Sequence, residues 1–290
     1  MIKIFCILFG IIFTGATDIA NGHGKVLQDE LTYEGFDEFE NQEEILKKHF
    51  NNKEWDALIF TQTWPPSDCI SWRQSSKRNK CRNLGDTKEE QWTIHGIWPT
   101  KWGTHGPMFC DRSKVFDLNT VHDLMTRMKS QWAPIEESGN GIHFWRHEWD
   151  KHGTCAAQLP ELGTPYKYIL QALTWNTRYN LKKWLSTGSI TAGKDYELSE
   201  IWEIINHESG VDPHIICFKD NKKNKNYLKE IRLCFDKKLS LIDCKPISGK
   251  KTGNISSLHS KILSHTYHCD FDLPVVYPSS KDVQPTFYYM

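Results

Sequence analysis

Apolar and polar residues follow two different periods along the chain, and each period predicts a type of element. Residues 56–64 are rich in apolar residues and threonine and end at a Pro-Pro pair, which predicts a strand. Apolar side chains alternate with polar ones in 228–235, and 214–218 is also mostly apolar, so both are predicted strands. Residues 67–90 are mostly polar and are predicted to form a loop.

Other segments repeat their apolar residues at steps of three and four, which is typical of amphipathic helices. Thr164 and Pro165 place a capping residue and a proline at a predicted helix start. One predicted helix begins at residue 165. The others cover residues 120–132, 179–185 and 198–207.

The first residues are typical of a targeting segment. Lys3 precedes an apolar run over 4–13 and small residues up to Ala16, which predicts a signal peptide over 1–16, with the cut as late as residue 20. The run is shorter than the roughly 20 residues of a membrane span, and no other stretch is long enough. We therefore expect a protein without a membrane span that is secreted, or alternatively retained in the lysosome or another endomembrane lumen.

The charge is unevenly distributed, although the whole chain is neutral. Residues 21–52 contain eight acidic residues and three lysines, a net charge of −5, so 53–290 carry +5. We interpret 17–52 as an acidic N-terminal extension and expect it to be flexible, because it has few apolar residues; the alternative is a propeptide or a lid over a basic site. The folded domain is expected over 53–272 and a C-terminal tail over 273–290.

The cysteines indicate an oxidising compartment. Nine are present, one of them (Cys6) in the signal peptide, and an even set of eight remains, which favours disulfides. The eight are Cys69, Cys81, Cys110, Cys155, Cys217, Cys234, Cys244 and Cys269. Sequence alone allows about a hundred pairings. Asn254 begins a sequon for glycosylation.

The densest group of chemically active residues lies in 144–155, which is predicted to be a short helix ending at Gly153. Glu148 lies three residues before Lys151 and four before His152, so the three share one helix face. A carboxylate, an ammonium and an imidazole on one face suit an anionic substrate that gains charge in its transition state. The alternative is a solvated, salt-bridged face.

A metal site is not expected on this helix. A zinc-protease helix has two histidines four residues apart, whereas His147 and His152 are five apart. On a regular α-helix that spacing separates them by about 140°. We therefore predict that the protein uses neither a metal nor another cofactor.

A second segment, 92–100, has the pattern of a strand end that runs into a Gly- and Pro-containing turn, with His95 at the strand end. The sequences His-Gly-Ile-Trp-Pro at 95–99 and His-Glu-Trp-Asp-Lys-His-Gly-Thr-Cys at 147–155 resemble the two active-site segments of the ribonuclease T2 family. This resemblance implies an α+β fold, with a central, mainly antiparallel sheet flanked by helices and stapled by disulfides. It also implies a metal-independent acid endoribonuclease with little base preference.

The resemblance assigns roles to individual residues. It implies that His95, Glu148 and His152 are catalytic, with His152 as base and His95 as acid. His147 and Lys151 would bind phosphate, and Trp98 would stack on a base, whereas Trp92, Trp145 and Trp149 are predicted to be core residues. The implied disulfides are Cys69–Cys81, Cys110–Cys155, Cys217–Cys269 and Cys234–Cys244. Thr100 departs from the family pattern, because many members have aspartate there, so a purine preference is not expected.

The expected substrate is single-stranded RNA, whose own 2′-hydroxyl attacks the neighbouring phosphorus. The product would be a 2′,3′-cyclic phosphate, and DNA would not be cut because it lacks the 2′-hydroxyl. A monomer is expected. The rival hypothesis is a secreted signalling or toxin-like ligand that acts through a receptor, with RNA cleavage incidental.

Overall fold

The computed structural model describes residues 53–76, 78–81, 90–104, 106–135, 141–247 and 258–283. All of them belong to the compact unit Glu44–Met290. The expected signal peptide, the acidic extension and Asn254 lie outside the described residues. None of the helices in the described part of the chain has the length and apolar character needed to cross a membrane.

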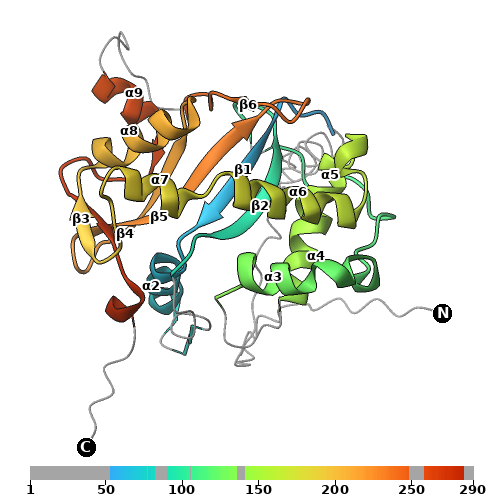
Figure 1. The fold of residues 1–290 in the computed structure, drawn as a ribbon, viewed down its shortest axis with the longest axis horizontal. Coiled ribbons are helices and arrows are strands. Elements are labelled where there is room, and N and C mark those ends of the chain that lie inside the picture. Colours follow the sequence, from blue (N-terminus) through green and yellow to red (C-terminus); the bar gives the residue numbers. More distant parts are fainter. Residues whose placement is uncertain are drawn as a thin grey trace, which may run out of the picture. The chain divides into compact units, whose positions relative to one another are not determined.

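A mixed, mainly antiparallel sheet forms the centre of the fold, with the strand order β2-β1-β5-β4-β7 (Figure 1). Two pairings are parallel, β4 with β7 and β5 with β8, and the other pairings are antiparallel. The strands are β1 (Ala57–Thr63), β2 (Thr93–Thr100), β3 (Lys194–Tyr196), β4 (His214–Asp220), β5 (Lys225–Phe235), β6 (Leu241–Ile242), β7 (Thr266–Tyr267) and β8 (Val275–Tyr277).

Helices flank this sheet, and α6, α7 and α8 lie across it in Figure 1. The α-helices are α2 (Pro65–Ser75), α3 (Met125–Gln131), α4 (Ile142–Glu148), α5 (Thr154–Ala156), α6 (Pro165–Arg178), α7 (Leu181–Thr187), α8 (Leu198–Ser209) and α9 (Leu258–Ser264). The other helical turns are η1 (Leu118–Leu124), η2 (Trp149–Gly153), η3 (Pro160–Leu162) and η4 (Ser280–Asp282).

The central sheet has one face against α6 and one face that carries polar side chains. On the helix side, the ring of Phe60 meets the edge of Trp175 at 5.6 Å, and Trp175 stacks on Phe235 at 3.8 Å. Side chains alternate along a strand, so Glu230 and Arg232 of β5 point to the opposite side. We call this opposite side, which also carries His95 and Trp98, the site face.

Most of the predicted elements are confirmed to within a few residues. They are the strands at 56–64, 214–218 and 228–235, the helix that begins at 165, and the helices at 179–185 and 198–207. Thr164 caps α6 as expected, because its hydroxyl accepts from the Lys167 amide. The helix predicted over 120–132 is present, but its first half is the tighter 3₁₀ turn η1.

Two boundaries differ from the prediction. Residues 67–90 were predicted as loop, yet α2 covers Pro65–Ser75, because the Pro-Pro pair occupies the first helical positions and Cys69 is buried. The folded domain was expected to end at residue 272, yet β8 pairs with β3 and β5, and Val275 and Tyr277 are buried. The sheet therefore continues into the predicted tail.

The structure contains four disulfides, in the pairing that the resemblance implied: Cys69–Cys81, Cys110–Cys155, Cys217–Cys269 and Cys234–Cys244. Two of them join segments more than 40 residues apart, and both of these pairs lie close to the polar residues described below.

Candidate active site

His95 lies within β2, not at a strand end as predicted, because β2 continues through Trp98 to Thr100. The pairing of β2 with β1 shifts register at this point: Gln62 is opposite Ile94 and Thr61 is opposite Gly96. His95 is therefore the extra residue of a β-bulge, a distortion that often redirects a side chain beside an active site. The bulge places the His95 ring on the site face.

The helix that carries the second motif is longer and less regular than predicted. It passes from α4 through η2 into α5, and the Thr154 amide donates to the carbonyl of Trp149, five residues earlier, which makes η2 a π-helical turn. Gly153 does not end it; a Cβ there would overlap the Trp149 ring, so glycine allows the close packing. The 140° separation of His147 and His152, which assumed a regular α-helix, does not apply across this turn.

Tryptophan side chains connect this helix to β2. The indole of Trp132 donates to the His95 carbonyl at 2.9 Å, and the indole of Trp145 donates to the Trp132 carbonyl at 2.7 Å. Trp92, Trp145 and Trp149 are buried, so their prediction as core residues is confirmed. These bonds satisfy indole groups that would otherwise be buried without partners.

The Cys110–Cys155 disulfide fixes the far end of the helix. The Cys110 amide donates to the Thr154 hydroxyl at 3.1 Å, and the Phe109 amide donates to the Lys151 carbonyl at 2.9 Å. Phe109 adopts a positive φ of 54°, which is uncommon outside glycine. The segment after β2 is therefore held against the π-helical turn.

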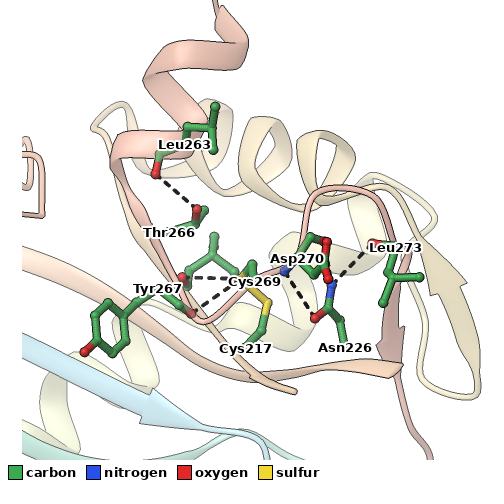
Figure 2. Close-up of a disulfide and its surroundings, with 9 residues drawn as sticks. Cys217, Asn226, Leu263, Thr266, Tyr267, Cys269, Asp270 and Leu273 are labelled. Carbon is green, nitrogen blue, oxygen red and sulfur yellow. Dashed lines mark hydrogen bonds between the residues drawn. A yellow bond between two sulfur atoms is a disulfide. The ribbon is translucent and has the colours of Figure 1, made fainter. Parts of the chain in front are cut away.

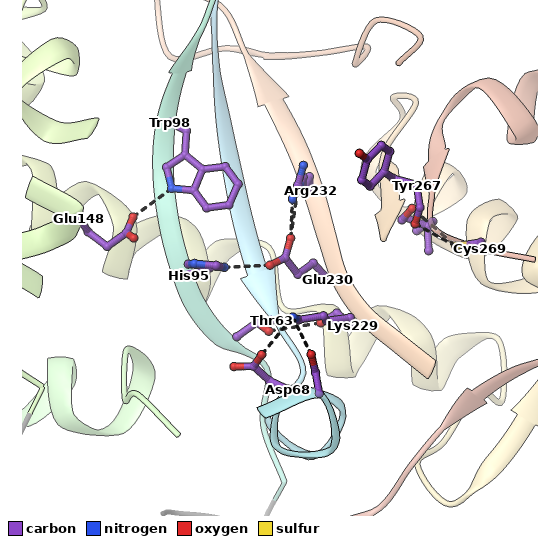
Figure 3. A network of polar contacts seen from close by, with 12 residues as sticks. Thr63, Asp68, His95, Trp98, Glu148, Lys229, Glu230, Arg232, Tyr267 and Cys269 are labelled. Atoms are coloured by element: carbon purple, nitrogen blue, oxygen red, sulfur yellow. Dashed lines mark hydrogen bonds and ion pairs between the residues drawn. The ribbon is translucent and has the colours of Figure 1, made fainter. Parts of the chain in front are cut away.

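Trp98 is the point where the two motifs meet (Figure 3). Its ring lies 4.9 Å from the His95 ring and 5.5 Å from the His152 ring, between centroids. Its indole donates to Oε2 of the buried Glu148 at 3.0 Å. The fold thus brings His95, Trp98, Glu148 and His152 together from segments about 50 residues apart.

Glu230 and Arg232 complete the cluster from β5, and the sequence alone did not indicate either residue. Nδ1 of His95 donates to Oε1 of Glu230 at 2.8 Å, because a carboxylate oxygen only accepts. Arg232 donates to Oε2 of Glu230 from Nε at 3.1 Å and from Nη2 at 2.6 Å. The same guanidinium lies 5.0 Å from the Trp98 ring centre, within cation–π range.

The two histidines have pKa values that shift in opposite directions. Burial alone lowers the pKa of His95, but the hydrogen bond and charge of Glu230 outweigh it and raise that pKa above its ordinary value. Burial, together with the charges of Lys151, His95 and His147, lowers the pKa of His152 well below its ordinary value. Nδ1 of His152 is buried and has no hydrogen-bond partner within the described residues. The arrangement favours a charged His95 beside a neutral His152.

Similarity to known proteins identifies the family of this chain. The model of the ribonuclease T2 family matches residues 55–244. The chain belongs to the ribonuclease T2 family. It is similar to Ribonuclease 1 of Arabidopsis thaliana, with 35% identity over 213 residues that cover 72% of this chain and 88% of that protein. It is also similar to Ribonuclease Oy of Magallana gigas, with 34% identity over 196 residues that cover 66% and 88%.

Solved structures give the same result for the fold. The ribonuclease resembles the crystal structure of RNase NT in complex with 5′-AMP, with a TM-score of 0.61 and 28% identity over 78% of this chain and 99% of that one. It also resembles human RNase T2, with a TM-score of 0.59 and 27% identity over the same shares. The expected α+β fold with a mainly antiparallel sheet is confirmed.

The other charged residues of this ribonuclease motif lie nearer to solvent. His147 is exposed, and its ring lies 6.4 Å from that of Phe109. Desolvation and the nearby Lys151 ammonium lower the pKa of His147. Glu148 differs, because burial raises the pKa of its carboxyl despite the opposing effect of His95 and Trp98. The cluster thus has the buried carboxyl of Glu148 on one side and the Lys151 ammonium with the exposed His147 imidazole on the other.

Within the described residues, one group of three has the spacing of metal ligands: His214, Cys234 and Cys244. The two cysteines form a disulfide with each other and provide no thiolate. This group therefore does not fit a metal, and it does not include the histidines of the ribonuclease motifs.

Gly96 allows β2 and the helix formed by α4, η2 and α5 to approach each other, so we expect Gly96→Ala to lower kcat/KM on RNA by at least about tenfold. An added Cβ would overlap Oε2 of Glu148 and lie 2.5 Å from Nε1 of Trp98, so their hydrogen bond would break. Steady-state cleavage assays measure this loss. Gly163→Ala is the control, because its Cβ would meet no atom closer than 3.3 Å. Equal activity of the two variants would contradict the expectation.

Proposed function

We propose that this ribonuclease cuts single-stranded RNA internally, by attack of the 2′-hydroxyl on the adjacent phosphorus, and leaves a 2′,3′-cyclic phosphate. One observation carries the proposal: two histidines from separate segments flank one indole, and their environments shift their pKa values in opposite directions. A pair of titratable groups separated in this way suits one base and one acid at the same pH.

His152 is the base in this proposal, because a lowered pKa keeps its imidazole neutral and able to accept the 2′-hydroxyl proton. His95 is the acid, because Glu230 favours its charged form, which then protonates the departing 5′-oxygen. Lys151 stabilises the negative charge that develops on the phosphorane, and Glu148 does so as a protonated carboxyl, the form that burial favours by raising its pKa. His147 contacts a phosphate. The buried Glu148 also holds the Trp98 indole in position.

Trp98 provides a surface for a base in the bound strand. Base stacking on an aromatic side chain contributes about 1–3 kcal/mol and tolerates every base, which fits an enzyme with little base preference. The Thr100 hydroxyl donates a hydrogen bond to the Trp98 carbonyl at 3.2 Å. RNase NT was crystallised with 5′-AMP, and a nucleotide ligand in a related structure supports this assignment.

The protein is proposed to act after entry into the secretory pathway, either outside the cell or in an endomembrane lumen. The four disulfides require an oxidising compartment for their formation. A relative with 32% identity is named Extracellular ribonuclease LE. Glycosylation at Asn254 and a monomeric state belong to the same proposal.

The test is cleavage of a single-stranded RNA by the disulfide-bonded protein between pH 4 and 8, with EDTA present. We expect cutting with a bell-shaped pH dependence, a 2′,3′-cyclic phosphate on the first product, and no cutting of the matching DNA strand. Absence of RNA cleavage would contradict the proposal. Cleavage that EDTA abolishes would show that the reaction depends on a metal.

A further inference from the structure

A groove of about 780 Å³ extends from Glu230 and Arg232 across the site face. It is lined by residues of β4, β5, β7 and the segment that follows β7, and beyond Glu230 and Arg232 none of these residues has a role in the reaction proposed above. Figure 3 shows Tyr267 beyond Arg232, on the opposite side of β5 from His95. The groove is therefore continuous with the cluster that holds the histidines.

The register of the sheet explains this continuity. Thr61 pairs with Gly96 on one side and with Arg232 on the other, and Ile216 pairs with both Glu230 and Tyr267. Directly paired residues point to the same face of a sheet. Arg232 and Glu230 lie two residues apart on β5 and therefore on the same face of the sheet. The site face thus extends from the bulge at His95 across β1, β5 and β4 to Tyr267.

Tyr267 is exposed but firmly held (Figure 2). Tyr267 is 44% exposed to solvent, which is high for a residue with a large aromatic side chain. Two residues later, Cys269 is joined to Cys217 of β4. The Asp270 amide donates to Oδ1 of Asn226 at 3.2 Å, and Nδ2 of Asn226 donates back to the Asp270 carbonyl at 2.6 Å. The disulfide and these hydrogen bonds hold the backbone that follows Tyr267 in place. A backbone that is already ordered reduces the entropic cost of binding a ligand at the Tyr267 ring.

Exposed lysines follow a residue that lines one end of the groove. Its acidic residues Glu230 and Asp270 are each paired with a cation that also lines the groove, Arg232 and Lys219 respectively. Asn221 lines the groove at the β4–β5 turn, and the next residues, Lys222 and Lys223, are exposed. This turn belongs to the Lys- and Asn-rich stretch 220–226. The groove is therefore lined by the exposed ring of Tyr267, and two exposed lysines follow its lining residue Asn221 in the chain.

We propose that this groove is a subsite for a further nucleotide of single-stranded RNA, with the base stacked on Tyr267 and a phosphate near Lys222 and Lys223. The inference rests on the proposed RNA cleavage. Four strand steps of about 4.8 Å separate β2 from β7, about 19 Å in all. A dinucleotide bound at His95 and Trp98 does not extend to Tyr267, whereas a longer strand does. Exposed aromatic residues on a sheet face bind bases in the same way in other RNA-binding folds.

The test compares an eight-nucleotide strand, in which a single ribonucleotide defines the cleavage site, with the dinucleotide that has the same cleavable bond. The ribonucleotide is placed near the 5′ end in one strand and near the 3′ end in another. For Tyr267→Ala, we expect the ratio of kcat/KM between octamer and dinucleotide to fall about 5- to 140-fold in at least one placement, which corresponds to the ~1–3 kcal/mol of one stacked base. Tyr267→Phe should retain the wild-type ratio.

Leu258→Ala is the matched control, because Leu258 is 49% exposed and does not line the groove. The double variant Lys222→Ala, Lys223→Ala should decrease the salt dependence of octamer cleavage, with the slope of log kcat/KM against log salt changing by about 0.7 for each phosphate that the enzyme no longer binds. An unchanged ratio for Tyr267→Ala in both placements would overturn the subsite. If the wild type cut neither substrate, the proposed function itself would be wrong.

Discussion

His152→Ala is expected to lower kcat on single-stranded RNA by about 10²–10⁴-fold, the usual contribution of a positioned general base. The His152 ring lies 5.5 Å from the Trp98 ring, and burial, followed by the positive charge of Lys151, lowers the pKa of His152 and favours its neutral imidazole. Alanine leaves the 2′-hydroxyl without an acceptor for its proton. The measurement is kcat at the wild-type pH optimum.

His143→Ala is the control for this substitution, because His143 lies on the same helix but is exposed and outside the cluster. It should retain the wild-type kcat. Thermal unfolding of both variants separates a loss of catalysis from a loss of structure. A folded His152→Ala enzyme with more than a tenth of the wild-type kcat would contradict the role of base.

The two motifs could be recognised in the sequence because each one is short. Between His147 and Cys155 all positions lie within one helical segment, so the motif can be recognised without any long-range contact. Even so, the π-helical turn η2 was not predicted, because it depends on packing between Gly153 and the Trp149 ring. The bulge at His95 was also missed, since it exists only in the pairing with β1.

Glu230 shows why the rest of the site could not be predicted. It lies 135 residues from His95 and reaches that residue only through the pairing of β1 with both β2 and β5. In the sequence, Glu230 and Arg232 are ordinary polar positions of an alternating strand, which usually point to solvent. Helix α2 was missed for a similar reason: its polar sequence has no clear apolar stripe, and its disulfide and buried Cys69 hold it in place.

His95→Ala is expected to lower kcat on RNA by about 10²–10⁴-fold, because the departing 5′-oxygen would leave without a proton. The leaving group distinguishes this loss from that of His152→Ala. A 4-nitrophenyl ester of a nucleoside 3′-phosphate releases a stable nitrophenolate that needs no proton. On this ester His95→Ala should lose little activity, whereas His152→Ala should lose as much as on RNA. The reverse pattern would exchange the acid and the base.

Glu230→Gln provides the pH test of the same assignment. Because Glu230 raises the pKa of His95, its removal lowers that pKa, so His95 loses its proton at a lower pH. The alkaline limb of the kcat profile on RNA should therefore move to lower pH, while the acid limb, which reports His152, should stay in place. In the His95→Ala background, Glu230→Gln should have no further effect on the pH profile, because Glu230 acts through His95. A shift of the acid limb, or a further change in the double variant, would show that Glu230 acts by another route.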